Sequence, residues 1–287
     1  MSFYSMRMIS GIKALPGIAL LLVCALNVQL AHGESAYGRF SPSLFSIDDA
    51  VVIAGWDTNE GQARLARSRH KTDYLQMAQH FQPQMNPLYC GVASSVIVLN
   101  SMRLPAGVTA HRSPVEKEIA ADPDDDWLKY PAYSQQNLLG DRTEAVKPRA
   151  VIEMRSTDDG EVDPGLTLAQ LKGILEAYDA TVELYYADKN NKAGMSAFRT
   201  TVRQALQESQ QFILVNFHGR SIGALTDGHI SPVAAYDERS DSILLLDVAG
   251  YLNPWYWVPV EHLYQAMHTR DGDNYRGYLV VRDGLIE

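Results

Sequence analysis

Residues 84–102 read QMNPLYCGVASSVIVLNSM, and this stretch places one cysteine where a turn gives way to an apolar helix. Asn86 and Pro87 mark the turn. Beyond it, apolar residues recur at helical spacing at Val92, Val96, Leu99 and Met102. Cys90 is therefore predicted in or just before the first helical turn, where free N–H groups and the helix dipole stabilise a thiolate. This is a suitable setting for a nucleophile; the alternative is that Cys90 is a small buried apolar residue.

The first 33 residues have the pattern of a signal peptide. Arg7 and Lys13 precede a mostly apolar segment, residues 14–30, and small residues follow at a cleavage site in residues 31–33. Proline, glycine and amide residues interrupt the apolar segment, which makes it a poor membrane span, since a span needs about 20 apolar residues. We expect an exported, periplasmic protein whose mature chain is residues 34–287. An uncleaved membrane anchor is the alternative.

The cysteine count supports a chemical role for Cys90. Cys24 belongs to the leader, and Val23 before it is not the small residue that a lipoprotein cleavage site requires. The mature chain then contains Cys90 alone, which cannot form an intrachain disulfide in an oxidising compartment. A free thiol in an exported protein suggests a function.

The charge of the chain argues against nucleic-acid binding. The leader holds two of the 25 Lys and Arg and none of the 34 Asp and Glu, which leaves 23 against 34 and a formal charge of −11. This excess of negative charge repels phosphate backbones, and no basic run with interleaved aromatic residues is present. The acidic run 122–126 resembles a calcium loop, but Trp127 and Tyr133 stand where an EF-hand needs glycine and glutamate.

Periodicity predicts further elements. Short helices are expected over 74–81 and after a Thr167 cap, and an amphipathic helix is expected around 198–206. Strands are expected over 181–186 and 212–217, followed by a hairpin with arms 228–236 and 242–248. Because the helices come early and the strands come as hairpins, the sequence predicts an α+β fold with a helical lobe packed on an antiparallel sheet.

The hairpin brings a histidine close to a carboxylate. If Tyr236 pairs with Ser242, then Ser231 pairs with Asp247, and His229 lies diagonal to Asp247 on the same face. A cysteine nucleophile needs an imidazole to take its proton and a carboxylate to orient the ring. His229 lies 139 residues after Cys90, within the separation of about 130–150 residues typical of papain-like chains. Taken alone, either residue has a plain structural explanation, His229 as a strand-end polar residue and Asp247 as a carboxylate near a turn.

The chain resembles the phytochelatin synthase family, whose catalytic domain is papain-like. The resemblance runs from about residue 74 to residue 281, and it is densest in PLYCGVASSVIVLNSM, GLTLAQLKGIL, FILVNFHGRSIGALTDGHISPVAAY, LLLDVAGYLNPWYWVPVEHLYQAM and YRGYLV. It implies a papain-like α+β fold, glutathione as the substrate, and a catalytic set of Cys90 as nucleophile, His229 as acid and base, and Asp247 as the orienting carboxylate. Gln84 matches the family glutamine six residues before the cysteine, and its amide is expected to bind an oxyanion with the Cys90 N–H.

The resemblance also implies a reaction. Cleavage of the Cys–Gly bond of glutathione through a thioester would give γ-Glu-Cys and glycine or, with a second glutathione, phytochelatin. The sequence ends at Glu287 without a cysteine-rich C-terminal region, so we expect the short prokaryotic type, in which hydrolysis exceeds polymerisation. Family members of that type imply a homodimer. No cofactor is expected, and a divalent ion such as cadmium or zinc is expected only as a glutathione thiolate complex.

The substrate carries two carboxylates, so the site needs a cation. Arg220 and Arg276 are the candidates, each with a plain surface role as the alternative. Tyr251, Trp255 and Trp257 are candidate walls of the cleft, with core packing as the alternative. Two other functions stay open: an exported papain-like peptidase or amidase using the same three residues, and a non-catalytic thiol or metal-binding protein, for which no ligand motif is found.

Overall fold

The computed structural model describes residues 53–106, 132–154, 164–188 and 192–285, all within the unit Tyr37–Glu287. The predicted signal peptide, residues 1–33, and the acidic run 122–126 lie outside the described residues. Among the helices in the described ranges, none combines the length and apolar character needed to cross a membrane.

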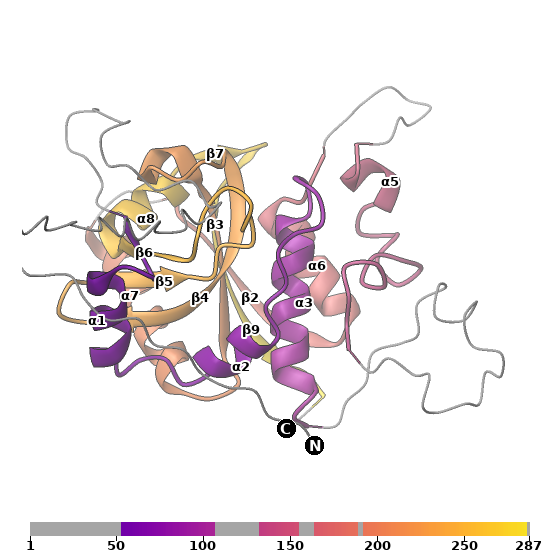
Figure 1. The fold of residues 1–287 in the computed structure, drawn as a ribbon. Coiled ribbons are helices and arrows are strands. Elements are labelled where there is room, and N and C mark those ends of the chain that lie inside the picture. The colour runs from indigo at the N-terminus through magenta and orange to yellow at the C-terminus, as the bar shows by residue number, and fades with distance from the viewer. Residues whose placement is uncertain (1–52, 107–131, 155–163, 189–191, 286–287) are drawn as a thin grey trace, which may run out of the picture. The chain divides into compact units, whose positions relative to one another are not determined.

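The described chain alternates between helices and strands (Figure 1). The helices are α1 (Asn59–Arg67), α2 (Tyr74–Gln79), α3 (Cys90–Arg103), α5 (Arg149–Ile152), α6 (Leu168–Ala177), α7 (Lys192–Gln207), α8 (Val260–Met267) and the 3-10 turn η3 (Gly219–Ile222). The strands are β1 (Ala54–Gly55), β2 (Ala180–Tyr186), β3 (Phe212–His218), β4 (Gly228–Asp237), β5 (Ser242–Leu245), β6 (Tyr256–Pro259), β7 (Arg270–Asp271), β8 (Asn274–Tyr275) and β9 (Gly277–Asp283).

One antiparallel sheet organises the described residues. Its strand order is β1-β6-β5-β4-β3-β9-β2, and each neighbouring pair is antiparallel. The central strands β3 and β4 are almost fully buried, as expected for strands covered on both faces. The mixture of helices with an antiparallel sheet confirms the α+β prediction.

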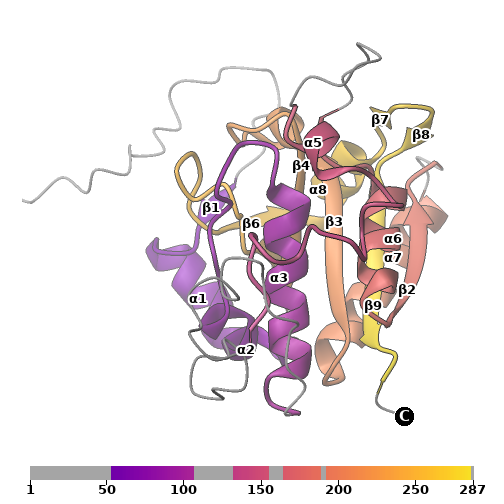
Figure 2. The ribbon, with the colours of Figure 1, turned by 90° about the vertical axis from the view of Figure 1, so that its right-hand side faces the viewer.

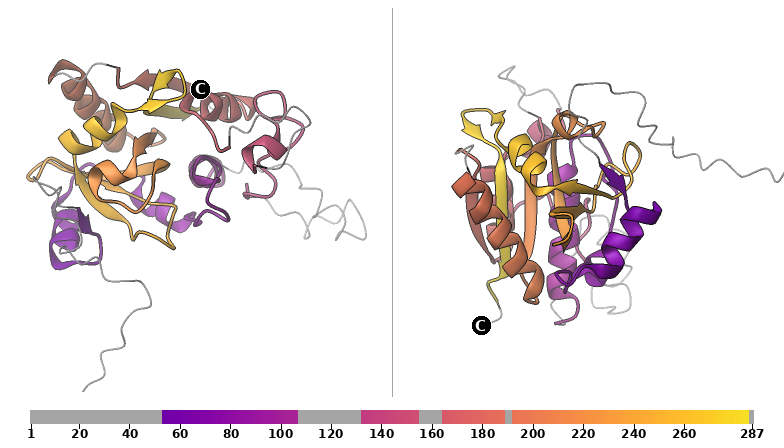
Figure 3. Two further views of the ribbon diagram at one scale, coloured as in Figure 1. Left: turned by 90° about the horizontal axis from the view of Figure 1, so that it is seen from above. Right: turned by 90° about the vertical axis from the view of Figure 1, so that its left-hand side faces the viewer.

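Helices cover both faces of this sheet. Figure 2 looks onto the face that α3 and α6 cover, and Figure 3 shows α7 and α8 on the opposite face. Each face has its own core of buried apolar side chains. The sequence did not predict the second helical layer, because α8 follows the hairpin in a part of the chain where only strands were expected.

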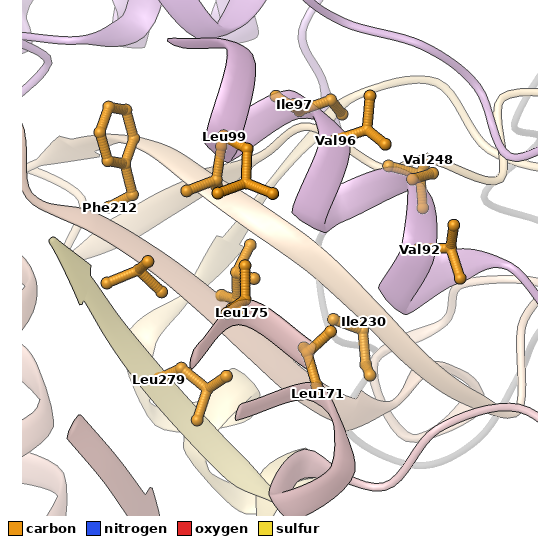
Figure 4. Close-up of a cluster of buried hydrophobic side chains, with 14 of the residues drawn as sticks. Val92, Val96, Ile97, Leu99, Leu171, Leu175, Phe212, Ile230, Val248 and Leu279 are labelled. Carbon is orange, nitrogen blue, oxygen red and sulfur yellow. The ribbon is translucent and has the colours of Figure 1, made fainter. Parts of the chain in front are cut away.

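Helix α3 is buried on all sides. Every residue from Gly91 to Arg103 is buried, including Ser94, Ser95 and Asn100. Figure 4 shows its side chains Val92 and Val96 facing Val248 and Ile230 of the sheet side, with Leu171 and Leu175 of α6 near them. A helix enclosed in this way is held by packing along its whole length, so the position of Cys90 at its first residue is well defined.

The predicted start of α6 is also confirmed. Thr167 caps the helix, its hydroxyl accepting from the Gln170 backbone N–H while the Gln170 side chain accepts from the Thr167 N–H. This reciprocal capping box satisfies two N–H groups that the helix itself leaves unpaired. It places α6 against α3, on the face of the sheet that carries the cysteine.

The predicted hairpin register is wrong near the turn and right further from it. The structure pairs Asp237 with Ser242 and Tyr236 with Ile243, one residue away from the predicted Tyr236–Ser242 pair. A β-bulge between Val233 and Ala235 then shifts the pairing, so that Val233 lies opposite Leu245. The extra residue that a bulge inserts in one strand cancels the error. Beyond that pair, the Leu246 N–H donates to the Pro232 carbonyl at 3.0 Å, which agrees with the predicted offset. The pairing of Ser231 with Asp247 stays a prediction.

Candidate active site

Cys90 is the first residue of α3 and is partly exposed. Tyr89, the preceding residue, makes no side-chain cap, so the N–H groups of the first turn stay available to an anion. Gly91 allows close packing here, because an added Cβ would lie only 3.2–3.4 Å from side-chain atoms of Leu166, Leu171 and Ile230. The helix start therefore sits close against β4.

A buried hydrogen bond fixes α3 relative to β4. The Ser94 hydroxyl donates to the Ile230 carbonyl oxygen at 3.1 Å. Ser94 lies one helical turn after Cys90, and Ile230 directly follows His229. This contact therefore sets the register between the helix that carries the thiol and the strand that carries the imidazole.

His229 and Asp247 are in direct contact, as the hairpin argument predicted. His229 Nε2 donates to Asp247 Oδ1 at 2.7 Å, and both side chains are buried. The Phe217 ring, opposite His229 in the β3–β4 register, packs edge-on against the imidazole with 5.7 Å between ring centroids. The contact occupies Nε2 and leaves Nδ1 available to Cys90, which lies near enough to help raise the pKa of the His229 ring.

Electrostatics around His229 favour the charged ring. Burial alone disfavours the imidazolium, but the charge and hydrogen bond of Asp247, followed by those of Cys90, outweigh it. Together they raise the pKa of His229 from its ordinary value of 6.5 to about 10. The imidazolium is therefore the stable form beside the thiol at neutral pH, which suits a thiolate–imidazolium pair.

Asp247 is held by two donors besides His229. The Ala249 backbone N–H donates to Oδ1 at 2.8 Å, and Asn253 Nδ2 donates to Oδ2 at 3.1 Å. Asn253 is itself fixed, because its Oδ1 accepts from the Leu225 N–H at 3.0 Å. The fully buried Tyr256 also lies close, and burial followed by the charge of Asp247 raises the pKa of its phenol well above its usual value. A carboxylate with this many donors is held in one orientation.

Gln84 lies near this site, with its side chain engaged by protein groups. Its backbone N–H donates to the Val248 carbonyl at 2.8 Å, which links it to the residue after Asp247. Its side chain is 6% exposed, and Nε2 donates to the Asn86 carbonyl at 3.0 Å and to the Tyr251 hydroxyl at 3.1 Å. The buried Oε1 has no partner among the described residues. The oxyanion role of Gln84 stays a prediction.

The two predicted arginines come from different segments: Arg220 lies in η3, and Arg276 lies between β8 and β9. Arg220 pairs with the carboxylate of Asp227, 2.6 Å away, and both side chains are exposed. Arg276 packs over Gly228, where an added Cβ would lie 2.6 Å from its Nη2. Since Gly228 directly precedes His229, Arg276 lies near the start of the strand that carries the candidate histidine.

Some residues near the site were missed from the sequence or only partly foreseen. Asn253 and Tyr256 were not predicted, although their place in the segment just after Asp247 was a usable signal. Tyr251 was considered as a cleft wall, and the structure puts its hydroxyl on Gln84. Trp257 is fully buried and Trp255 packs against the core, which agrees with the alternative of core packing for those two. Within the described ranges, no group of three or more His, Cys, Asp or Glu side chains is placed to hold a metal ion.

The fold and the site together define a class: an α+β protein in which a cysteine at a helix start contacts a histidine that is oriented by a buried aspartate. The phytochelatin synthase family model matches residues 50–278, so the chain belongs to the phytochelatin synthase family.

Similar curated proteins carry the name glutathione gamma-glutamylcysteinyltransferase. The enzyme numbered 3 from Lotus japonicus is 25% identical over 255 residues, covering 85% of this chain and 44% of that protein. Number 1 from Arabidopsis thaliana is 24% identical and covers 86% of this chain and 44% of its own length. The Schizosaccharomyces pombe protein is 25% identical, and the match covers 86% of this chain and 53% of that protein. The chain thus spans about half the length of these relatives.

Proposed function

We propose that this protein cleaves the Cys–Gly bond of glutathione through a thioester on Cys90. The observation that carries the proposal is the continuous contact from Cys90 to His229 to Asp247 in a chain of this family. The names of the similar proteins support a γ-glutamylcysteinyl transfer from glutathione. The helix start at Cys90 and the raised pKa of His229 support a thiolate nucleophile.

In the acylation step, the Cys90 thiolate attacks the carbonyl carbon of the cysteine residue of glutathione. The tetrahedral intermediate collapses as the C–N bond breaks, and His229 gives its proton to the departing glycine amine. The products are free glycine and a γ-glutamylcysteinyl thioester on Cys90. Asp247 keeps the ring oriented and stabilises its charge before the transfer.

In the second step, the now neutral His229 takes a proton from the incoming nucleophile. Water attacks the thioester and gives γ-Glu-Cys, whereas the amine of a second glutathione gives phytochelatin with two γ-Glu-Cys units. Either attack breaks the C–S bond and returns the thiolate of Cys90 and the imidazolium of His229. We propose that hydrolysis exceeds transfer.

The remaining site residues have roles in binding. We propose that the Gln84 amide and the Cys90 N–H bind the oxyanion, with a value of about 3–4 kcal/mol for such a donor. Arg220 and Arg276 are proposed to bind the substrate carboxylates, since Arg220 pairs with Asp227, just before β4, and Arg276 packs over Gly228, the residue before His229. No bound cofactor is required, and cadmium or zinc takes part as a glutathione thiolate complex.

The broader proposals concern fold, assembly and compartment. A papain-like fold is supported by the buried helix that begins at the cysteine and packs on the antiparallel sheet carrying the histidine. A homodimer and export to the periplasm rest on the family type and on the leader pattern of residues 1–33. Intact-mass analysis of protein made with its leader tests the export: a mature N-terminus near Glu34 supports it, and a full-length cytosolic product contradicts it.

Mass spectrometry of the purified mature protein with glutathione tests the function. We expect glycine and γ-Glu-Cys as main products, with phytochelatin appearing at high glutathione, and the assay is repeated with cadmium and with zinc. Cys90→Ser should abolish glycine release and keep the fold, because a hydroxyl is a far poorer anion at neutral pH. Cleavage of other peptides without cleavage of glutathione would instead identify an exported peptidase or amidase.

A further inference from the structure

Tyr251 is a half-exposed tyrosine whose hydroxyl is bonded to Gln84, a residue of the candidate active site. Its side chain is 53% exposed, yet the hydroxyl oxygen accepts a hydrogen bond from Gln84 Nε2 at 3.1 Å. An exposed phenol is usually bonded to water, so a defined bond to a nearly buried amide is a specific arrangement.

The segment that carries Tyr251 is fixed by the same residues that hold the carboxylate. Asp247 accepts from the Ala249 N–H, and the Ala249 carbonyl accepts from the N–H groups of Leu252 and Asn253 at 2.8 and 3.0 Å. Asn253 then donates back to Asp247. Tyr251 therefore lies in a closed turn around Asp247, which fixes its backbone, and the bond from Gln84 orients its hydroxyl.

The donors of Gln84 are already in use. One N–H of its amide goes to the Asn86 carbonyl and the other to the Tyr251 hydroxyl. An amide has only these two donors, so an oxyanion can take a bond from Gln84 only by displacing one of these partners. The next donor in this series of hydrogen bonds is the Tyr251 O–H. Its proton has no acceptor among the residues that the structure describes.

Charge also connects Tyr251 with the thiol. Burial first, and then the negative charges of Cys90 and Asp247, raise the pKa of the Tyr251 phenol, against the opposing hydrogen bond from Gln84. The phenol therefore keeps its proton at neutral and mildly alkaline pH. A hydroxyl that accepts one hydrogen bond is polarised and donates the next one more strongly.

We propose that the Tyr251 hydroxyl donates a hydrogen bond to the oxyanion of the tetrahedral intermediate on Cys90, held and polarised for this purpose by Gln84. The inference rests on the proposed acyl transfer, and it adds the Tyr251 hydroxyl as a further donor beside the Gln84 amide and the Cys90 N–H. Tyr251 would then contact the reacting oxygen and be a catalytic residue.

Tyr251→Phe tests the proposal, because it removes the hydroxyl and keeps the ring. Loss of one oxyanion donor costs about 100- to 1000-fold in kcat in a serine protease, and we expect about 10- to 100-fold here because the Cys90 N–H remains. KM for glutathione should change little. Tyr185→Phe is the matched control: Tyr185 is also partly exposed and its hydroxyl is bonded to a protein group, Glu183, on β2.

A second measurement separates an oxyanion role from a structural one. Aldehydes add to Cys90 and form a hemithioacetal whose oxygen occupies the oxyanion position, whereas dithiodipyridine reacts with the thiol without any oxyanion. In Tyr251→Phe, the affinity for an aldehyde of S-methylated γ-Glu-Cys and for a plain N-acetyl aminoaldehyde should fall at least tenfold. The rate and pH profile of the dithiodipyridine reaction should stay those of the unmodified protein.

The other outcomes overturn the proposal. Equal losses in both reactions would mean that Tyr251 acts on the thiol or on packing, and unchanged or tighter aldehyde binding would mean that the hydroxyl is no donor. The plain aldehyde does not depend on glutathione. If the unmodified protein releases no glycine but Tyr251→Phe still loses aldehyde affinity, the proposed substrate fails while the role of Tyr251 stands.

Discussion

Asp247 accepts more hydrogen bonds than the proton transfer itself requires. His229, Ala249 and Asn253 all donate to it, and the turn that holds Tyr251 closes around it. One carboxylate thus orients the imidazole and also fixes the backbone beside Gln84. A substitution of Asp247 tests the contact with the imidazole most directly if it keeps the size of the side chain and removes only its charge.

Asp247→Asn is expected to lower glycine release by between about tenfold and 10⁴-fold, the upper value being the cost of the corresponding change in one serine protease. The amide keeps the size of the side chain but cannot offer the charge that raises the pKa of His229. Turnover and the pH profile of the dithiodipyridine reaction are measured together, and the profile should move. Asp241→Asn, in the hairpin turn at φ 46°, is the control, since asparagine tolerates that backbone. Full activity with an unchanged profile would show that another residue orients His229.

At the scale of elements, the contact between α3 and β4 decides whether thiol and imidazole meet. The two elements are far apart in the sequence and are joined by the Ser94–Ile230 hydrogen bond. Ser95, the next residue, is also buried, but its hydroxyl has no partner among the described residues. The two serines therefore form a natural pair for comparison.

Ser94→Ala should destabilise the protein by about 1 kcal/mol, the usual net value of one hydrogen bond, and should lower kcat several-fold by loosening the helix against the strand. Ser95→Ala should be neutral or slightly stabilising, because it removes an unpaired buried hydroxyl. Urea unfolding and glycine release are measured for both variants. Equal effects of the two substitutions would count against a role for the Ser94 contact.

The elements also show how far the sequence could be interpreted. The cap at Thr167, the helix after Cys90 and the hairpin arms follow from local patterns, and the structure contains each of them. The bulge near Ala234 has no local signal, since no glycine marks it, and it depends on how β4 meets β5. The burial of Ser94, Ser95 and Asn100 likewise results from enclosure of α3 by distant segments. The Gln84–Tyr251 bond joins residues 167 positions apart, which no local pattern predicts.

At the scale of the whole described unit, one sheet separates two apolar cores, and both His229 and Asp247 are buried. Burial of His229 beside a fixed carboxylate links the stability of the fold to pH. The pKa of His229 is about 10 in the folded chain against 6.5 for an ordinary histidine, so folding tightens proton binding.

This linkage has a definite sign. The contribution of His229 to stability should be fully present below pH about 6.5 and should decline as pH rises toward about 10. The free energy of unfolding of the unmodified protein should fall between about pH 6 and about pH 9.5. This fall should exceed that of the His229→Gln variant by roughly 1–3 kcal/mol. Urea unfolding at the two pH values measures this difference. His218→Gln, which changes a partly buried ring outside the candidate site, should follow the unmodified protein; parallel losses in His229→Gln would contradict the linkage.

The bulge between Val233 and Ala235 has an evolutionary consequence. It separates the hairpin into a distal part, where the turn lies, and a proximal part, where His229 faces Asp247. A bulge absorbs one residue of mismatch between paired strands, so an insertion or deletion in the turn can be compensated there without moving His229 and Asp247. Lineages of this family can therefore vary the length of the distal turn, and acquire new surface contacts through it, while the chemistry at the other end of the same two strands is inherited unchanged.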